Sequence, residues 1–379
     1  MIGWITRAFF LAAVATAQEK PLVVGAVVSE TGAHAAAAAD YRKGLLLWAE
    51  QAKVDLRLKD DASEAAKTGP AYAALIADGA QVLIGPYGSA ATLTGSAEAE
   101  RSRRVMLNAA GPSGQVHKRQ PRYVFQTSPP YTAYADGALA MAREAKAESL
   151  YIVARDDAGS REMGEAALNL GRKLGFQHVE LEIYSAGTVD FLPQLYKAMG
   201  VHADAWIAFG EPRDGGDIVK TLKKQGYEPR MLYVRDSPDP RFRQRIGQDA
   251  EFILGSKEYD ARFPAAGNEE FVKAFKAKWS ATPGPLAAAA YAAGTVLAEG
   301  VRRAGSAEGA KLRVALSSLE MDTVLGHYKV EPATGAQIGM KPVITQTIGG
   351  RPQPIWPAEF ADSRKLLPFL SWAEREILK

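Results

Sequence analysis

The chain has 379 residues, of which 47% are hydrophobic and 23% are charged, and its 46 basic and 43 acidic residues give a net charge of +3. This balance is that of a globular protein and excludes a disordered or fibrous chain. So small a charge excess, with no Lys/Arg-rich run, gives no reason to expect a nucleic-acid partner. The absence of cysteine excludes thiolate catalysis and soft-metal sites.

The first 17 residues, "MIGWITRAFFLAAVATA", have the features of a secretory signal peptide. A single cation, Arg7, precedes an apolar run over residues 8–15, and "ATA" at residues 15–17 fits the small-x-small cleavage rule. The run is shorter than the roughly 20 residues that a membrane span needs, and the chain has no cysteine for a lipid anchor. We expect a signal peptide over 1–17 and a secreted, periplasmic protein, with a short membrane anchor as the alternative.

Strands and helices are predicted to alternate along the rest of the chain. The apolar run Leu22–Val28 is typical of a strand covered on both faces. A helix follows, with Tyr41, Leu45 and Trp48 on one stripe. The next helix is expected to begin near Pro70, after the alternating strand "VDLRLKDD". Further expected strands are "QVLIG", "RVMLN", "SLYIVARDD", "HVELEIYS", "AWIAFG" and "RMLYVRD", with helical segments between them. This order predicts doubly wound parallel sheets, and their number favours two α/β lobes.

No motif of a known catalytic chemistry is present. The sequence lacks G-x-G-x-x-G, a phosphate-binding loop, H-E-x-x-H and G-x-S-x-G, and its five histidines are scattered without ligand spacing. The pairs Asp60-Asp61 and Asp156-Asp157 follow strands, where aspartate is a favoured helix cap. We therefore expect no enzyme, no cofactor and no metal site. A secreted hydrolase or accessory protein would need a nucleophile–base pair that the sequence does not display.

Small and hydroxyl-bearing residues gather where the expected strands end. In open α/β sheets ligands bind at the carboxyl ends of strands, and the N–H groups at a helix start bind carboxylates. The segment "LIGPYGSAAT" is the clearest case, because it leaves a strand through Ser89, Ala90 and Thr92 with no bulky side chain among them. The sequence thus predicts a cleft that holds an anionic group at this loop.

Four stretches resemble the type I periplasmic solute-binding proteins of ABC importers, in particular the leucine/isoleucine/valine-binding group. They are "VVGAVVSETG", "IADGAQVLIGPYGSAAT", "YVFQTSPP" and "FVKAFKAKWSATPGPLAAAAYAAGTVLAEGVRRAG". The resemblance covers residues 21 to 350 and implies two α/β lobes joined by three crossover strands, with the ligand between them. We expect lobe 1 over 21–130 plus 262–326, and lobe 2 over 131–261 plus 327–379.

The resemblance also implies site residues. The family's S-x-x-T loop, which holds a ligand carboxylate, falls on Ser89 and Thr92, and its next loop, small-x-Thr, falls on Ala110 to Ser113, where "AAGPS" lacks the usual threonine. The candidates of the first lobe are Thr31, Tyr87, Ser89, Ala90, Thr92, Ala110 and Ser113.

In the second lobe the sequence departs from the family pattern. The two acids that hold a ligand amino group fall on Tyr131, which is not acidic, and on Asp236. Ser160 lies where a ring-stacking tyrosine is usual, and Glu211 lies where many relatives have tyrosine. Because an unpaired buried ammonium costs several kcal/mol, a branched-chain amino acid is disfavoured, and an aromatic acid or amide fits as well.

These features predict a solute-binding protein that captures a small polar or carboxylate-bearing ligand and delivers it to an ABC permease in the inner membrane. We expect it to be a monomer. Two alternatives stay open at this point: a ligand sensor for a membrane receptor, and the secreted enzyme or accessory protein named above.

Overall fold

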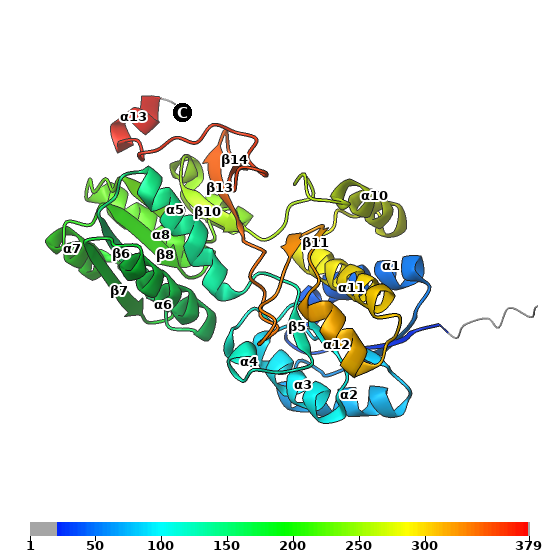
Figure 1. Cartoon of the computed structure of the whole chain (residues 1–379). Helices are drawn as coiled ribbons and strands as arrows, with labels where there is room; N and C mark the ends of the chain where they lie inside the picture. Colours follow the sequence, from blue (N-terminus) through cyan, green and yellow to red (C-terminus); the bar gives the residue numbers. More distant parts are fainter. Residues whose placement is uncertain (1–20, 378–379) are drawn as a thin grey trace, which may run out of the picture.

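The structure is a computed structural model that describes residues 21–377 and has two α/β lobes (Figure 1). In Figure 1 the first lobe, which carries the blue and cyan start of the chain, lies at the lower right, and the green second lobe lies at the upper left. In both lobes helices cover a mainly parallel sheet, so the predicted doubly wound α/β class is confirmed. The signal peptide expected at 1–17 lies outside the described residues.

The first lobe has a five-stranded parallel sheet in the order β2-β1-β3-β4-β5. Its strands are β1 (Val23–Val28), β2 (Asp55–Asp60), β3 (Val82–Ile84), β4 (Met106–Asn108) and β5 (Val124–Gln126). Its helices are α1 (Ala35–Ala52), α2 (Ala65–Ala77), α3 (Ser89–Ser102), α4 (Gln115–Lys118), α10 (Asn268–Trp279), α11 (Pro285–Ala304) and α12 (Gly309–Ser317). Helix α2 begins five residues before Pro70, which lies inside it rather than at its first turn.

The alternation of side chains along β1 explains why both faces of this sheet are covered. Val24 and Val28 pack with Tyr41 and Trp48 of α1 in one core, whereas Val27 packs with Tyr72 of α2 in another. Successive side chains of a strand point to opposite faces, so a continuous apolar run requires helices on both sides.

The second lobe has a seven-stranded sheet in the order β14-β13-β10-β9-β8-β6-β7. Strands β6 to β10 are parallel, and β13 and β14 add an antiparallel edge. The strands are β6 (Ser149–Arg155), β7 (His178–Tyr184), β8 (Ala205–Phe209), β9 (Met231–Val234), β10 (Leu254–Lys257), β13 (Val343–Ile348) and β14 (Arg351–Trp356). The helices are α5 (Tyr134–Glu144), α6 (Ala158–Lys173), α7 (Leu192–Gly200), α8 (Pro212–Lys224), α9 (Pro240–Ile246) and α13 (Trp372–Ile377), with 3-10 turns η1 (Tyr131–Ala133) and η2 (Gly247–Ala250).

The chain passes between the lobes after β5, after β10 and before β13. The last passage differs from the boundary expected at residue 327. The hairpin of β11 (Met321–Thr323) and β12 (Gly326–Tyr328) belongs to the first lobe, since Tyr328 and Val330 lie in its core. The Gln126 N–H also donates to the carbonyl of Gly335 at 2.8 Å. The second lobe therefore resumes close to β13.

Candidate functional site

A pocket of about 450 Å³ lies at the carboxyl ends of three neighbouring strands of the second lobe. The loops after β6, β8 and β9 contribute most of its lining, and the first passage between the lobes contributes Tyr131. The predicted candidates Tyr131, Ser160, Glu211 and Asp236 all line it. These candidates come from four separate segments, and they lie together at the carboxyl ends of strands, where ligands of open α/β sheets bind.

In the first lobe, the turn after β3 and the turn after β4 lie side by side. Tyr87 and Ala110 form a parallel bridge, and the Gly88 N–H donates to the Ala110 carbonyl at 3.0 Å. Helix α3 begins at Ser89, and no side chain caps it because its N-cap residue is Gly88. The first N–H groups of a helix have no partner within it, so the N–H groups around Ser89 and Ala90 remain for an anion.

The Ser89 hydroxyl donates to no acceptor in the part of the chain that the structure describes, residues 21–377. Its oxygen accepts the Ser113 N–H at 3.2 Å, which leaves the hydroxyl hydrogen available for a ligand acceptor. Asn108 was not among the predicted residues, yet its buried amide fixes the next turn by donating to the Gly111 carbonyl and accepting the Gly111 N–H, both at 2.9 Å. An asparagine that ends a strand is the signal that points to such a turn.

Two predicted hydroxyl contacts are engaged within the protein instead. Thr92 is fully buried, and its hydroxyl donates to the Gly88 carbonyl at 2.9 Å. It lies directly behind Gly111, where an added Cβ would come within 2.2 Å of Thr92 Oγ1. The Ser113 hydroxyl donates at 2.7 Å to Glu162 of the second lobe. In this structure, then, Thr92 supports the loop and Ser113 connects the lobes, and neither points its hydroxyl to the pocket.

Thr31 is exposed, and Asp60, the last residue of β2, holds it in place. Its hydroxyl donates to Asp60 at 2.6 Å, and Asp60 also accepts the Glu30 N–H at 2.9 Å. The neighbouring Asp61 is buried and accepts the hydroxyl of Ser29 at 2.7 Å. Asp60 and Asp61 thus hold loops together but do not cap a helix as expected, because α2 begins at Ala65 and its N-cap residue is Glu64.

Tyr131 lies against the second lobe at the first passage between the lobes. Its ring covers Gly159, where an added Cβ would lie 2.9 Å from the ring carbon that bears the hydroxyl. Burial raises the pKa of Tyr131, and the charge of Arg235 opposes that shift. The hydroxyl therefore keeps its proton near neutral pH and can donate it to a ligand.

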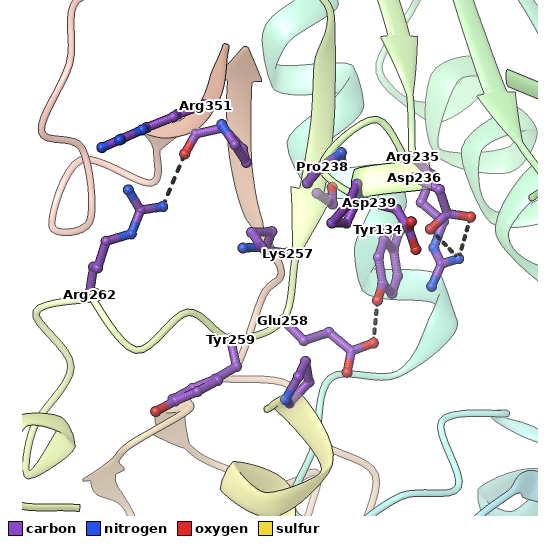
Figure 2. Close-up of a pocket in the computed structure, with 14 residues that line it drawn as sticks. Tyr134, Arg235, Asp236, Pro238, Asp239, Lys257, Glu258, Tyr259, Arg262 and Arg351 are labelled. Atoms are coloured by element: carbon purple, nitrogen blue, oxygen red, sulfur yellow. Dashed lines mark hydrogen bonds and ion pairs between the residues drawn. The ribbon is translucent and has the colours of Figure 1, made fainter. Parts of the chain in front are cut away.

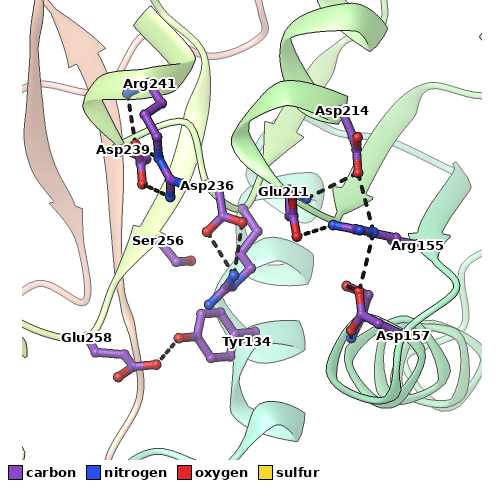
Figure 3. A network of polar contacts seen from close by, with 12 residues as sticks. Tyr134, Arg155, Asp157, Glu211, Asp214, Asp236, Asp239, Arg241, Ser256 and Glu258 are labelled. Atoms are coloured by element: carbon purple, nitrogen blue, oxygen red, sulfur yellow. Dashed lines mark hydrogen bonds and ion pairs between the residues drawn. The ribbon is translucent and has the colours of Figure 1, made fainter. Parts of the chain in front are cut away.

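Two arginines at strand ends were not predicted from the sequence. Figure 3 labels Arg155 beside Glu211, and Figure 2 labels Arg235 beside Asp236. Arg155 ends β6 and pairs with Glu211, and its Nε lies 4.0 Å from Asp214. Arg235 follows β9, and its Nη1 donates to both oxygens of Asp236 at 2.8 and 3.0 Å. The sequence contains a signal for both arginines. Each is followed by aspartate at the end of an expected strand, in "VARDD" and "YVRD".

Arg235 is held from several sides. Its guanidinium carbon lies 5.0 Å from the centre of the Tyr134 ring, and the Tyr134 hydroxyl donates to Glu258. Its Nε is buried and has no hydrogen-bond partner among residues 21–377. Burial raises the pKa of Asp236, and the Arg235 charge opposes that shift.

A family model described as periplasmic binding protein matches residues 21–349. The chain belongs to this family. Among solved structures, a leucine-binding protein of Thermotoga maritima is 21% identical with a TM-score of 0.69, over 88% of this chain and 97% of that one. A putative branched-chain amino acid ABC transporter protein of Silicibacter pomeroyi is 16% identical with a TM-score of 0.81, over 92% and 99%. A solute-binding protein of Rhodopseudomonas palustris in complex with 3,4-dihydroxybenzoic acid is 20% identical with a TM-score of 0.69, over 93% and 99%. At these identities the structures show the type I periplasmic binding protein fold.

In this periplasmic binding protein the acids of the second lobe are already engaged. Asp157 accepts the Ser160 N–H and hydroxyl, both at 2.9 Å, and so caps α6. Glu211 accepts from Arg155 and from the start of α8, where it forms a capping box with Asp214. The predicted candidates Ser160 and Glu211 thus line the pocket while their polar atoms hold the protein's own elements.

Neither a metal site nor a membrane-crossing helix is found in the described part of the chain. Residues 21–377 contain no group of three or more His, Asp or Glu side chains placed to hold a metal ion. None of their helices combines the length and the apolar character that a membrane span requires.

Proposed function

We propose that this periplasmic binding protein captures a small polar or carboxylate-bearing molecule without an ammonium group, an aromatic acid or amide being the preferred class, and delivers it to an ABC permease. The observation that carries this proposal is the position of Arg235. Its guanidinium lies at the carboxyl end of β9, beside Tyr131, and its buried Nε has no hydrogen-bond partner within the described residues 21–377.

The two lobes offer complementary donors for one carboxylate. The first lobe contributes the uncapped start of α3 and the hydroxyl proton of Ser89, and helix N-termini favour anions. The second lobe contributes Arg235, and arginine binds carboxylates through its fork of N–H donors. A ligand carboxylate between the lobes would therefore join them, which couples binding to closure.

An ammonium group finds little to bind. Asp236 gives both oxygens to Arg235, Asp157 caps α6, and Glu211 pairs with Arg155. Because a buried ammonium without acceptors costs several kcal/mol, these contacts disfavour a branched-chain amino acid. They support the interpretation reached from the missing acid at Tyr131.

Aromatic side chains favour a ring-bearing ligand. The half-buried Tyr87 ring meets His34 edge-on at 5.5 Å between centroids, Tyr131 covers Gly159, and Tyr134 lies under Arg235. Rings of this kind give an apolar wall that a planar acid can contact. Phe209, by contrast, is fully buried in the core of the second lobe and does not contribute to this wall.

Calorimetric titration of the purified protein with benzoate, benzamide and leucine tests the proposal. We expect benzoate or benzamide to bind and leucine not to bind. Arg235→Gln should weaken benzoate binding about tenfold or more, because a hydrogen bond to a charged group contributes about 1.5–3 kcal/mol. The matched control Arg119→Gln changes an exposed arginine of the first lobe and should leave the affinity unchanged. Tight binding of leucine alone would contradict the proposal.

Delivery to a permease needs a separate test in cells. Uptake of the bound acid should require both this protein and the membrane permease, and it should be restored by the wild-type gene but not by the Arg235→Gln gene. If the cell responds to the ligand without importing it, the protein is a sensor subunit. Release of product from an ester or amide by the purified protein would instead favour an enzyme.

A further inference from the structure

A second cavity, of about 810 Å³, adjoins the candidate ligand pocket (Figure 2). The two share Arg235 and Asp236 in their linings. Figure 2 shows Arg235 and Tyr134 at one end of this cavity, Arg262 and Arg351 at the other, and Lys257 between them. Pro285, the first residue of α11, also lines it, so the cavity is formed by both lobes.

The carboxylates near the Arg235 end are all engaged. Asp236 binds Arg235, Asp239 binds Arg241 at 2.7 Å, and Glu258 accepts the hydroxyl of Tyr134. Two arginines accompany three carboxylates here, so this end has no excess of positive charge.

The far end has more positive than negative charge. Lys257 and Arg262 share one carboxylate, Asp260, at 2.6 and 2.9 Å. The lysine and arginine hold the pKa of Asp260 well below its usual range although burial opposes the shift, so it carries a full negative charge. Arg351 lines the same cavity, and its guanidinium has no ion-pair or hydrogen-bond partner among residues 21–377. This end thus has three cations, of which Lys257 and Arg262 share the carboxylate of Asp260.

We propose that this cavity is a second subsite for a second anionic group, and that the ligand is an elongated dianion. One end would lie at Ser89 and Arg235, and the other at Arg262 and Arg351. This inference rests on the proposed function, since it extends the same ligand. Like charges held close together raise the electrostatic energy, which a bound anion lowers, and two guanidinium groups suit a carboxylate.

The shape of the cavity fits a ligand body of this kind. Its volume lies within the range of about 300–1,000 Å³ that is typical of small-molecule sites. The lining of the cavity includes four prolines, whose rings are rigid and apolar. These are Pro238, Pro240, Pro285 and Pro352. An apolar spacer between two acid groups would lie against them.

Titration with matched pairs of acids tests the inference: benzoate against terephthalate, and octanoate against suberate. Each pair shares its carbon skeleton except for the second carboxylate. We expect at least one diacid to bind about tenfold more tightly than its monoacid at low salt, as a charge-assisted contact would give. Arg351→Gln should remove that difference and leave the monoacid affinity unchanged, whereas Arg119→Gln should change neither.

The outcomes separate the inference from the proposed function. Equal affinity for monoacid and diacid, or a preference for the diacid that survives Arg351→Gln, would overturn the second subsite and leave the proposed function standing. Failure of all four acids to bind would overturn the proposed function and the inference with it. Arg351 is exposed, and thermal melting of the variant verifies that it folds.

Discussion

Glu162 of the second lobe accepts a hydrogen bond from Ser113 of the first. The Ser113 hydroxyl lies 2.7 Å from Glu162 Oε2, and the N–H of the next residue, Gly114, lies 2.7 Å from Oε1. Glu162 is part of α6, and Gly114 is the N-cap of α4. Both oxygens of the Glu162 carboxylate thus accept hydrogen bonds from Ser113 and Gly114, and these two bonds connect the lobes.

We predict that Glu162→Gln shifts the ligand-free protein toward a more open arrangement of the lobes. The amide keeps one acceptor and loses the other, and each hydrogen bond to a charged group contributes about 1.5–3 kcal/mol. Small-angle X-ray scattering should record a larger radius of gyration for the variant. Glu165→Gln, one turn along the same helix on an exposed position, should leave the radius unchanged. Equal radii for all three proteins would contradict the closing role of Glu162.

The sequence predicted the fold well because its signals are local. Apolar runs such as Leu22–Val28 and the Tyr41 stripe depend on spacing alone, and both lobes follow from their alternation. The site was predicted at the level of loops, since strand ends and small residues such as Ser89 are visible in the chain. These are the features that the structure reproduces.

The directions in which individual side chains point could not be predicted from the sequence. Thr92 and Ser89 belong to one motif, yet the first turn of α3 directs Thr92 inward to Gly88. The partner of Ser113 lies 49 residues along the chain in the other lobe. The role of Arg235 depends on Tyr134, which only the folded chain brings beneath it. Contacts between segments that are distant in the chain decide these roles, and such contacts cannot be predicted from a single sequence.

Asp61 should be one of the most sensitive acids of the first lobe. It is fully buried and accepts from the Ser29 hydroxyl at 2.7 Å, the Ser63 N–H at 3.0 Å and the Thr68 hydroxyl at 3.1 Å. Asp61→Ala removes the acceptor from all three donors, so the free energy of unfolding should fall by about 2–4 kcal/mol. Urea denaturation measures the change. The exposed Asp78, 3.6 Å from Lys59, is the control, and Asp78→Ala should cost less than about 1 kcal/mol.

His117 should make stability depend on pH. It is buried, its Nδ1 lies 2.9 Å from the Thr334 carbonyl, and its Nε2 lies 3.4 Å from the amide of Asn108. Burial lowers the pKa of His117, with the hydrogen bond to Thr334 opposing that shift. The folded protein therefore binds this proton less readily than the unfolded chain, whose histidine titrates near about 6.5.

The sign of the effect follows from that difference. As the pH falls below about 6.5, the unfolded chain takes up the proton first, so the free energy of unfolding decreases, by at most about 1.4 kcal/mol per pH unit for one group. Urea denaturation between about pH 7.5 and about pH 5 measures this slope. His117→Gln should flatten it, whereas His178→Gln, at an exposed position, should not. An unchanged slope in the His117 variant would contradict the prediction.

At Gly44, helix α1 packs directly against the backbone of α11. An added Cβ at Gly44 would lie 2.1 Å from the backbone carbonyl oxygen of Ala287, and backbone atoms of a packed helix cannot move aside cheaply. We predict that Gly44→Ala lowers the free energy of unfolding by about 1–3 kcal/mol, as overpacking does, despite the better helix propensity of alanine.

Gly69 provides the matched control for this effect. It lies within α2, and apart from its chain neighbours an added Cβ would meet nothing closer than a methyl group of Thr94 at 3.5 Å. Gly69→Ala should therefore change the free energy of unfolding by less than about 1 kcal/mol, because the gain in helix propensity is opposed by contact of the new Cβ with the ring of the next residue, Pro70. Urea denaturation of both variants separates close helix contact from propensity. If Gly44→Ala proved as stable as Gly69→Ala, the two helices would be farther apart than the contact between Gly44 and Ala287 requires.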